Sequence, residues 1–275
     1  MAGIVVVFDF DKTIIEKDSD NWVVDELGFT DLFNRLLPTM PWNSLMDTMM
    51  TEMHDARVTI NDIAEVLKRT PIHPRIIEAI KSAYAAGCEL RIVSDANLFF
   101  IETILNHLGL REYFAEINTN PGFVDEEGRL RVLPLHDFSK SSHGCGNLCP
   151  PNMCKGAIVR RILSEADEKQ KKLIYLGDGT GDYCPSLSLR AGDHLMPRKN
   201  FPLWDLICKN PKLITASIHE WTDGAELESI LLYLIDAITN SVDDVSGQLL
   251  MPYCKFERIP LVSHEALPKA LHVHP

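Results

Sequence analysis

The sequence contains no hydrophobic run long enough to cross a membrane and no cluster of basic residues. Its most continuous apolar stretch, residues 4–8, is far shorter than the ~18 apolar residues that a transmembrane helix needs. No basic segment precedes this stretch and acidic residues follow it, which is unlike a signal peptide. The 39 Asp and Glu residues outnumber the 27 Lys and Arg residues, for a formal net charge of -12. We therefore expect a cytoplasmic protein that binds neither nucleic acid nor an anionic membrane surface.

Cysteine is scarce and odd in number, with 7 residues in 275, which does not fit the disulfide framework of a secreted domain. Three of them, Cys145, Cys149 and Cys154, lie close together, and His143 is nearby. Thiolate and imidazole are zinc ligands, although this spacing is looser than that of the usual C-x2-C pairs. Three alternatives stay open: a structural zinc site of these four residues, a disulfide, or reduced cysteines that pack the loop before Lys155.

No linker rich in proline, glycine or serine divides the chain, and no internal repeat is present. A content of 45% hydrophobic and 24% charged residues is typical of a globular protein. Apolar and β-branched residues alternate with helical patterns such as residues 76–86 and 97–107, which favours a doubly wound α/β fold with a central parallel sheet. Four segments predict strands of this Rossmann-like core: residues 3–10, 89–94, 172–177 and 194–196.

The helical stretch between the first two predicted strands is too long for a single crossover, so it predicts an inserted cap. Within it, Met46, Met49, Met50 and Met53 recur at helical spacing and predict a packed apolar helix face. Residues 123–132 predict a hairpin with an acidic turn. The expected organisation is a catalytic core of residues 1–18 and 87–240, a mostly helical cap of residues 19–86, and an irregular tail of residues 241–275.

Polar residues follow three of the predicted strands directly, and a lysine lies early in a helix that we expect to start near Met153. The carboxyl ends of parallel strands meet at one edge of a sheet, which is where ligands bind in such folds. Asp9 and Asp11 are two residues apart in an extended segment, so their side chains lie on the same side. The full set of these polar residues is Asp9, Asp11, Thr13, Ser94, Asp95, Lys155, Asp178 and Asp182.

The order of these segments resembles the haloacid dehalogenase superfamily of phosphotransferases. Its signature is D-x-D-x-T, then Ser or Thr after a strand, then Lys, then G-D-x-x-x-D. The resemblance implies that Asp9 is a nucleophile that forms an aspartyl-phosphate, which divides one difficult displacement into two easier ones. It implies that Asp11 protonates the leaving oxygen and later takes a proton from water, for which it needs a raised pKa. Ser94 and Lys155 would hold the phosphoryl oxygens.

The resemblance also implies a Mg²⁺ cofactor, since several acids in one pocket need a hard cation with oxygen ligands. Asp9 and Asp178 are its expected side-chain ligands, and Asp11 would contribute its backbone carbonyl. Thr13 is expected to steady the loop after Asp9. Asp182 is expected to be either a supporting partner or an indirect ligand.

Three further segments, residues 18–22, 92–97 and 149–156, are similar to one branch of the superfamily, the phosphoethanolamine/phosphocholine phosphatases. That branch includes plant members induced by phosphate starvation, some of which are described as inorganic pyrophosphatases. Within it, Asp20 and Asp95 match positions assigned to substrate binding. Acids beside a phosphate pocket suit a substrate whose other end is cationic, and Trp22 or Trp42 could add a cation–π contact. We therefore expect hydrolysis of phosphoethanolamine and phosphocholine.

Two other functions stay open. Pyrophosphate could be hydrolysed at the same site if it arrives as a Mg²⁺ complex, with Arg198 or Lys199 assisting, and pyridoxal or thiamine phosphate are related alternatives. The fold could also serve as a non-catalytic module that binds a phosphate ligand. All four residues expected to be essential are present, which argues against that module, because a catalytically inactive relative usually loses one of them: Asp9, Asp11, Lys155 and Asp178. The sequence does not predict the oligomeric state.

Overall fold

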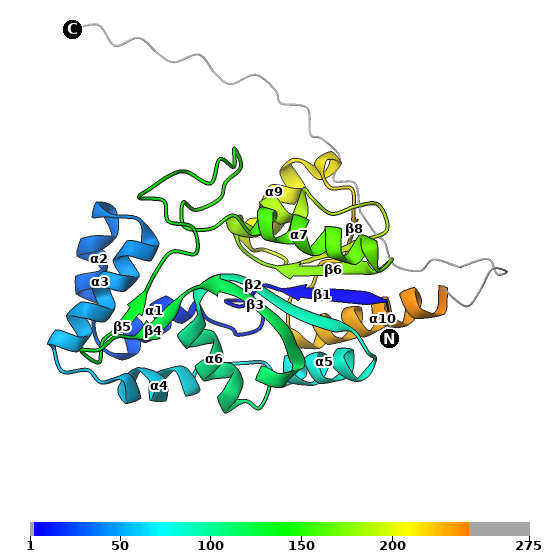
Figure 1. Ribbon diagram of the computed structural model, residues 1–275. Helices are drawn as coiled ribbons and strands as arrows, with labels where there is room; N and C mark the ends of the chain where they lie inside the picture. The colour runs from blue at the N-terminus through cyan, green and yellow to red at the C-terminus, as the bar shows by residue number, and fades with distance from the viewer. Residues whose placement is uncertain (1–2, 242–275) are drawn as a thin grey trace, which may run out of the picture. The chain divides into compact units, whose positions relative to one another are not determined.

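The structure is a computed structural model that describes residues 3–241 (Figure 1). The predicted irregular tail, residues 241–275, lies outside the described residues apart from Ser241. None of the described helices is both long and apolar enough to cross a membrane.

Six parallel strands form the central sheet: β1 (Ile4–Phe8), β2 (Glu89–Asn97), β3 (Phe114–Asn120), β6 (Lys172–Gly177), β7 (His194–Pro197) and β8 (Ser217–Ile218). Their order across the sheet is β3-β2-β1-β6-β7-β8, so β1 lies between β2 and β6. The predicted doubly wound α/β fold with a central parallel sheet is confirmed.

Strand β1 is buried on both faces, which explains its almost uninterrupted apolar sequence. Ile4, Val6 and Phe8 belong to the apolar core on one face of the sheet. Val5 and Val7 belong to the core on the other face. Because successive side chains of a strand point in opposite directions, one run of five apolar residues serves both cores.

Helices cover both faces of this sheet (Figure 1). α5 (Pro74–Ala85), α6 (Leu98–His107) and α10 (Gly224–Ser241) contribute to the core on one face. α7 (Lys155–Glu168) and α9 (Pro202–Lys209) contribute to the core on the other face. The remaining short elements are α8 (Tyr183–Ser186) and four 3-10 helices, η1 (Leu37–Thr39), η2 (Arg111–Tyr113), η3 (Thr180–Asp182) and η4 (Pro211–Leu213).

Four helices precede α5 and form the inserted cap: α1 (Ser19–Glu26), α2 (Thr30–Leu36), α3 (Trp42–Asp55) and α4 (Ile60–Lys68). The four methionines of α3 are buried, as the predicted apolar face requires. The predicted hairpin forms from β4 (Gly122–Val124) and β5 (Leu130–Val132), where Arg131 holds Asp47 of α3 with two hydrogen bonds of 2.9 and 2.7 Å. Because α5 packs against α10 and β2 rather than joining the cap helices, we propose that the cap ends near residue 70 instead of residue 86.

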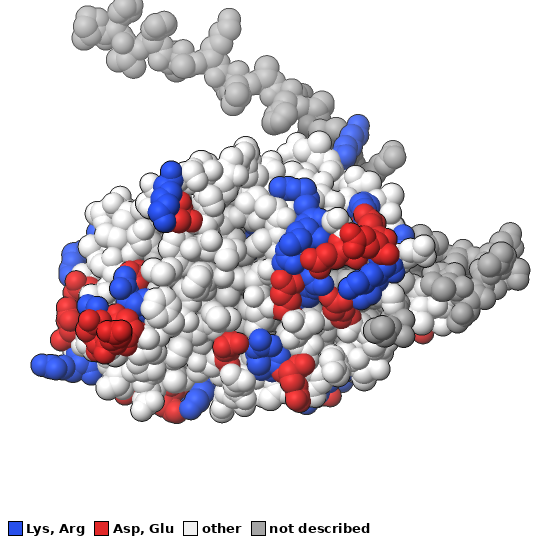
Figure 2. Space-filling model, in the orientation of Figure 1, with Lys and Arg blue, Asp and Glu red and all other residues white. Residues whose placement is uncertain are grey.

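Charged side chains fix α7 on the sheet. The buried Arg91 of β2 forms ion pairs of 2.7 Å with both Glu116 of β3 and Glu165 of α7. Arg161 of α7 contacts the same two carboxylates at 2.6 and 2.8 Å. Lys and Arg alternate with Asp and Glu over this part of the surface (Figure 2). The position of α7 matters because Lys155 is its first residue.

Candidate active site

A cavity of about 500 Å³ opens where the predicted catalytic segments meet, after the carboxyl ends of β1 and β6 and beside the end of β2. Its wall combines carboxylates, two lysines, the loop after β6 and a short apolar segment before α7. The residues that line it are Asp9, Asp11, Lys12, Asp18, Asp95, Leu148, Cys149, Pro150, Lys155, Asp178, Gly179, Thr180 and Gly181.

Asp9 lies at the base of this cavity and is almost wholly buried. Its backbone N–H donates to the carbonyl of Leu176, which fixes the residue at the end of the β1–β6 ladder. Its Oδ1 accepts from the N–H of Phe10 at 2.7 Å and contacts Lys155 Nζ at 2.8 Å. These contacts leave Oδ2 as the oxygen available for attack. Burial and the charge of Asp182 raise the pKa of Asp9, so the carboxylate needs a positive charge beside it.

Lys155 supplies one such charge. It is 3% exposed, and its Nζ lies 2.8 Å from Asp9 and 2.9 Å from Asp182. Burial alone would lower the pKa of this ammonium, but Asp182 and Asp9 raise it well above its usual value. Lys155 is therefore a buried, permanently charged cation at the base of the cavity.

Asp182 is fully buried and both of its oxygens are occupied. Its Oδ1 accepts from Lys155 Nζ at 2.9 Å and from the hydroxyl of Tyr175 at 2.7 Å. Its Oδ2 accepts from the backbone N–H groups of Asp178 at 3.1 Å and Gly179 at 2.9 Å. A side chain at Gly177 would overlap this carboxylate, which accounts for glycine there. The geometry favours a supporting role for Asp182 over direct contact with a metal.

The carboxylates fit a magnesium ion by their chemistry. Asp9, Asp178 and Asp182 bring one oxygen each within 4.8 Å of one another. Asp178 is engaged only weakly, by the hydroxyl of Thr13 at 3.4 Å, and burial together with Asp182 raises its pKa to about 7. Three carboxylates and the single ammonium of Lys155 leave a net charge of -2 in a buried cluster of hard oxygen donors. A divalent, oxygen-seeking cation balances that charge.

Asp11 has the environment of a general acid. Its Oδ2 accepts from the hydroxyl of Ser19 at 3.1 Å, whereas its buried Oδ1 has no hydrogen-bond partner among the described residues. Burial, followed by the charges of Asp18 and Asp20, raises its pKa well above the usual value for a carboxyl. A carboxyl that keeps its proton near neutral pH can donate it to a leaving oxygen.

The loop after Asp11 is held in a strained conformation. Lys12 has φ of 56°, in the left-handed region that a non-glycine residue rarely adopts. Arg198 donates to the carbonyl of Lys12 at 2.6 Å and to Glu16 at 2.6 Å. Arg198 therefore anchors the catalytic loop from outside the cavity. Lys199 likewise does not line the cavity and lies 3.9 Å from Glu220, so neither predicted cation is placed to assist a pyrophosphate.

Of the three residues predicted to contact the substrate, one lines the cavity and two are buried away from its lining. Asp95 lines the cavity with its side chain 46% exposed. Ser94 is fully buried behind the lining, and its oxygen accepts from the N–H of Ala96 at 3.4 Å. Asp20 is also buried away from the lining, where Trp42 donates to its Oδ2 at 2.7 Å. Burial and the charge of Asp18 raise the pKa of Asp20 to about 8.

Among the charged residues that line the cavity, only Asp18 and Lys12 receive no role from the sequence. Asp18 caps the first turn of α1, accepting from the N–H of Asn21 at 3.1 Å, and it contacts Lys12 Nζ at 3.2 Å. The available signal was an acid directly before a predicted helix, which describes an ordinary N-cap equally well. Trp22, by contrast, donates to the carbonyl of Val66 at 3.1 Å and packs within the cap, and it does not line the cavity.

The four residues considered for zinc do not come together as a set. His143 contacts the carbonyl of Pro150 at 3.0 Å through Nε2, and its Nδ1 accepts from the N–H of Cys145. The sulfur atoms of Cys145, Cys149 and Cys154 do converge, but their fourth neighbour is Cys184. The six cysteines in the described part of the chain are all free, so the disulfide alternative is wrong there.

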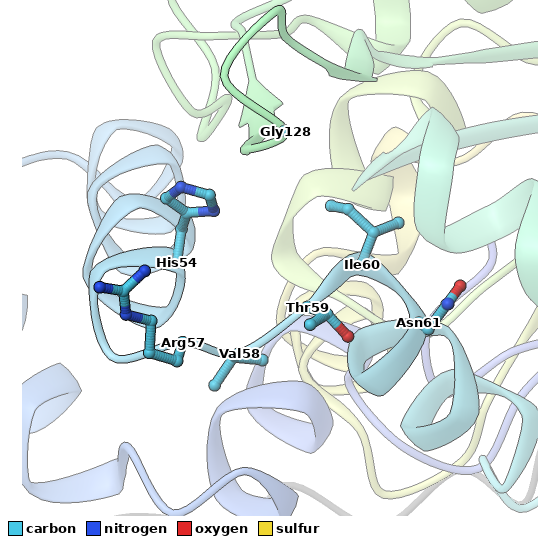
Figure 3. Close-up of a pocket in the computed structure, with 7 residues that line it drawn as sticks. All are labelled: His54, Arg57, Val58, Thr59, Ile60, Asn61 and Gly128. Carbon is cyan, nitrogen blue, oxygen red and sulfur yellow. The ribbon is translucent and has the colours of Figure 1, made fainter.

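A second hollow, of about 380 Å³, lies between the end of α3, the start of α4 and the turn of the β4–β5 hairpin (Figure 3). The residues that line it in the described part of the chain include no carboxylate and no thiol. Of these residues, only His54 and Arg57 have side chains that can carry a charge. It therefore lacks the carboxylates that the first cavity brings together.

Comparison with known proteins agrees with this chemistry. A family model described as Putative Phosphatase matches residues 4–235. Inorganic pyrophosphatase 2 of Arabidopsis thaliana is 67% identical over 87% of this chain and 86% of that protein. A thiamine phosphate phosphatase-like protein of the same plant is 52% identical over 88% of this chain and 100% of that protein. The phosphoethanolamine/phosphocholine phosphatase of Gallus gallus is 30% identical over 84% of this chain and 88% of that protein.

Solved structures share the fold at low sequence identity. A substrate-bound phosphoserine phosphatase superposes with a TM-score of 0.55 and 15% identity, covering 83% of this chain and 97% of the other. An identity this low establishes the architecture alone. The family match extends over most of the chain, and the chain therefore belongs to the Putative Phosphatase family, whose members have the fold of haloacid dehalogenase-type hydrolases.

Proposed function

We propose that the protein is a Mg²⁺-dependent phosphohydrolase that works through an aspartyl-phosphate on Asp9. The observation that carries the proposal is the buried contact of 2.8 Å between Asp9 and Lys155, at the base of a cavity that also exposes Asp11 and Asp178. Phosphoryl transfer depends on neutralising charge and aligning the attack, and this arrangement provides for both.

In the first half of the reaction, Asp9 Oδ2 attacks phosphorus and Asp11 gives its proton to the departing oxygen. Lys155 neutralises charge on the phosphoryl group and keeps Asp9 oriented through Oδ1. In the second half, Asp11 takes a proton from water, which attacks the aspartyl-phosphate and releases inorganic phosphate. Asp9, Asp178 and the backbone of Asp11 would hold Mg²⁺, which supplies further charge neutralisation when it is bound.

Pyrophosphate is the substrate that we favour. It is supported by the 67% identity to a protein named inorganic pyrophosphatase 2, more than twice the identity to the phosphoethanolamine/phosphocholine phosphatase. Asp18 and Asp95 form an acidic rim of the cavity. This rim is compatible with pyrophosphate as the substrate if pyrophosphate enters as a Mg²⁺ complex, because the carboxylates would then face the metal on the outer phosphate. Among the described residues, Lys12 is the only cation at this rim. This reverses the preference drawn from the sequence alone.

Phosphoethanolamine and phosphocholine remain a second candidate for one specific reason. The rim carboxylates Asp18 and Asp95 would attract an ammonium group as well as they would attract Mg²⁺. Thiamine phosphate, which also carries a positive charge, fits the same argument and the 52% identity to the thiamine phosphate phosphatase-like protein.

The test compares kcat/KM for pyrophosphate, phosphoethanolamine, phosphocholine and thiamine phosphate on one preparation over a range of Mg²⁺ concentrations. We expect pyrophosphate to lead by at least ~10-fold, with a steeper dependence on Mg²⁺ because the substrate carries its own ion. Asp95→Asn should raise KM, whereas Glu126→Gln, an exposed acid in the distant hairpin turn, should leave it unchanged. A lead for any organic phosphate would refute the choice of pyrophosphate and leave the mechanism intact. Equal, metal-independent turnover of all four would refute the mechanism.

A further inference from the structure

Four cysteine sulfur atoms form a compact cluster beside the active-site cavity. The Sγ atoms of Cys145, Cys149, Cys154 and Cys184 all lie within 4.8 Å of one another. Four of the six separations are hydrogen-bond-length contacts: 3.6 Å for Cys145–Cys184, Cys145–Cys149 and Cys149–Cys154, and 3.9 Å for Cys154–Cys184.

These separations have the size of a tetrahedral zinc–thiolate site. With Zn–S bonds of ~2.3 Å, the edge of a regular tetrahedron of sulfur atoms is ~3.8 Å. A disulfide would instead require one pair of sulfur atoms at ~2.05 Å. Packing of thiols as small apolar groups does not require all four sulfur atoms to point toward a common centre, as they do here.

N–H groups surround the cluster in the manner of donors to thiolate. The Asn147 side-chain amide donates to Cys184 Sγ at 3.2 Å, and the backbone N–H of Ala157 donates to Cys154 Sγ at 3.4 Å. Such outer hydrogen bonds orient metal ligands and stabilise their charged form. A side chain at Gly156 would overlap Cys184 Sγ, so glycine is required for α7 to approach the cluster this closely.

The segment that carries two of these cysteines has no buried core of its own. Residues 133–150 contain no helix or strand, and none of them is buried. A long segment without a core of its own is unusual in a compact domain unless something clamps it. It nevertheless forms part of the active-site wall, through Leu148, Cys149 and Pro150.

We infer that Cys145, Cys149, Cys154 and Cys184 bind one structural zinc ion, which clamps the segment of residues 133–150 to the starts of α7 and α8. Four thiolates fill the coordination shell, so the ion has no open position for catalysis. Its role follows from its neighbours in sequence. Cys154 directly precedes Lys155, and Cys184 lies two residues after Asp182, so one ion ties together both segments that supply the charged base of the cavity.

The first test measures zinc by mass spectrometry in the purified full-length protein after exhaustive dialysis. We expect about one zinc ion per chain in the unmodified protein and in Cys208→Ser, whose exposed thiol lies outside the cluster. Cys149→Ser and Cys184→Ser should each lower zinc retention at least ~10-fold. Equal zinc contents in all four proteins would overturn the assignment of the ligands.

A second measurement covers the case in which those variants fail to fold. Zinc is removed from the unmodified protein and replaced by cobalt(II), which should give the intense thiolate-to-cobalt absorption of a tetrahedral four-sulfur site. Two results would overturn the inference. In the first, the unmodified protein contains no zinc and takes up neither zinc nor cobalt. In the second, the purified protein is coloured and contains iron. Neither readout depends on the substrate, so the result is independent of the proposed function.

Discussion

The variant Asp182→Asn distinguishes between two possible roles of Asp182, as a carboxylate that supports its neighbours or as a direct metal ligand. In the absence of Mg²⁺, three buried carboxylates share one ammonium group, and removal of a crowded charge would by itself stabilise the fold. Asp182, however, accepts hydrogen bonds from Lys155, Tyr175 and two backbone N–H groups. We therefore expect Asp182→Asn to destabilise the metal-free protein, because its partners outweigh the repulsion.

The magnitude follows from the contacts. Removing one partner of a buried, hydrogen-bonded ion pair costs ~3–5 kcal/mol, because the remaining charge is left uncompensated. Lys155 keeps Asp9 at 2.8 Å, so the expected loss for Asp182→Asn is nearer the lower value, about 3 kcal/mol. Tyr175→Phe deletes only one hydrogen bond to a charged group and should cost ~1.5–3 kcal/mol.

The assay is urea unfolding at pH 8 without Mg²⁺, followed by tryptophan fluorescence, since Trp221 is fully buried. Asp178→Asn is the matched control. Asp178 has one weak hydrogen bond, and its pKa of about 7 lies above the value in the unfolded chain. Its charge therefore destabilises the fold above pH 7, and removing the charge should stabilise the protein at pH 8. If Asp182→Asn also stabilises the protein, Asp182 is a crowded ligand and the supporting role assigned to it is wrong.

Three further outcomes are expected. Asp9→Asn should reduce phosphate release below ~1% while keeping the urea midpoint at or above that of the unmodified protein; higher residual turnover would point to another nucleophile. The Mg²⁺ concentration for half-maximal activity should rise ~5-fold between pH 7 and pH 6, because protons occupy Asp178 below its pKa of about 7; a flat profile across that range would contradict its role as a ligand. Arg198→Met should lower kcat ~10-fold with little change in KM, since Arg198 holds the strained Lys12 carbonyl, and unchanged kcat would mean that the loop keeps its conformation without it.

The central strands β1 and β6 could be predicted from the sequence because they are buried on both faces and therefore apolar almost throughout. Two strands could not be predicted. β3 is an edge strand whose Glu116 and Asn118 face charged or polar partners on α7, so its apolar pattern is interrupted. β8 has only two residues, Ser217 and Ile218, too few to show any period. Prediction from hydrophobic patterns depends on burial and on a run long enough to show a period. The edge strand β3 lacks the first, and the short strand β8 lacks the second.

The cysteine cluster marks a different limit. Cys145, Cys149 and Cys154 lie within ten residues, so their grouping is visible in the sequence, and His143 is the nearest residue that could complete it. Cys184 is thirty positions beyond Cys154 and reaches the cluster only because α8 packs against α7. Spacing rules recognise ligand pairs carried on one segment. A fourth ligand that arrives through helix packing has no local signal.

The acidic residues around the active-site cavity show why residue type alone does not assign a functional role. Asp18 and Asp20 lie two positions apart at the start of α1, but of the two only Asp18 lines the cavity. Asp18 is the extended N-cap residue of the helix, whereas Asp20 is buried in its first turn and accepts a hydrogen bond of 2.7 Å from Trp42. Asp20 still acts on the site through its charge, which helps to raise the pKa of Asp11. Apart from Asp9, Asp11 and Asp178, the acids that line the cavity are therefore Asp18 and Asp95. In this arrangement they are the carboxylates placed to contact a cation carried by the substrate.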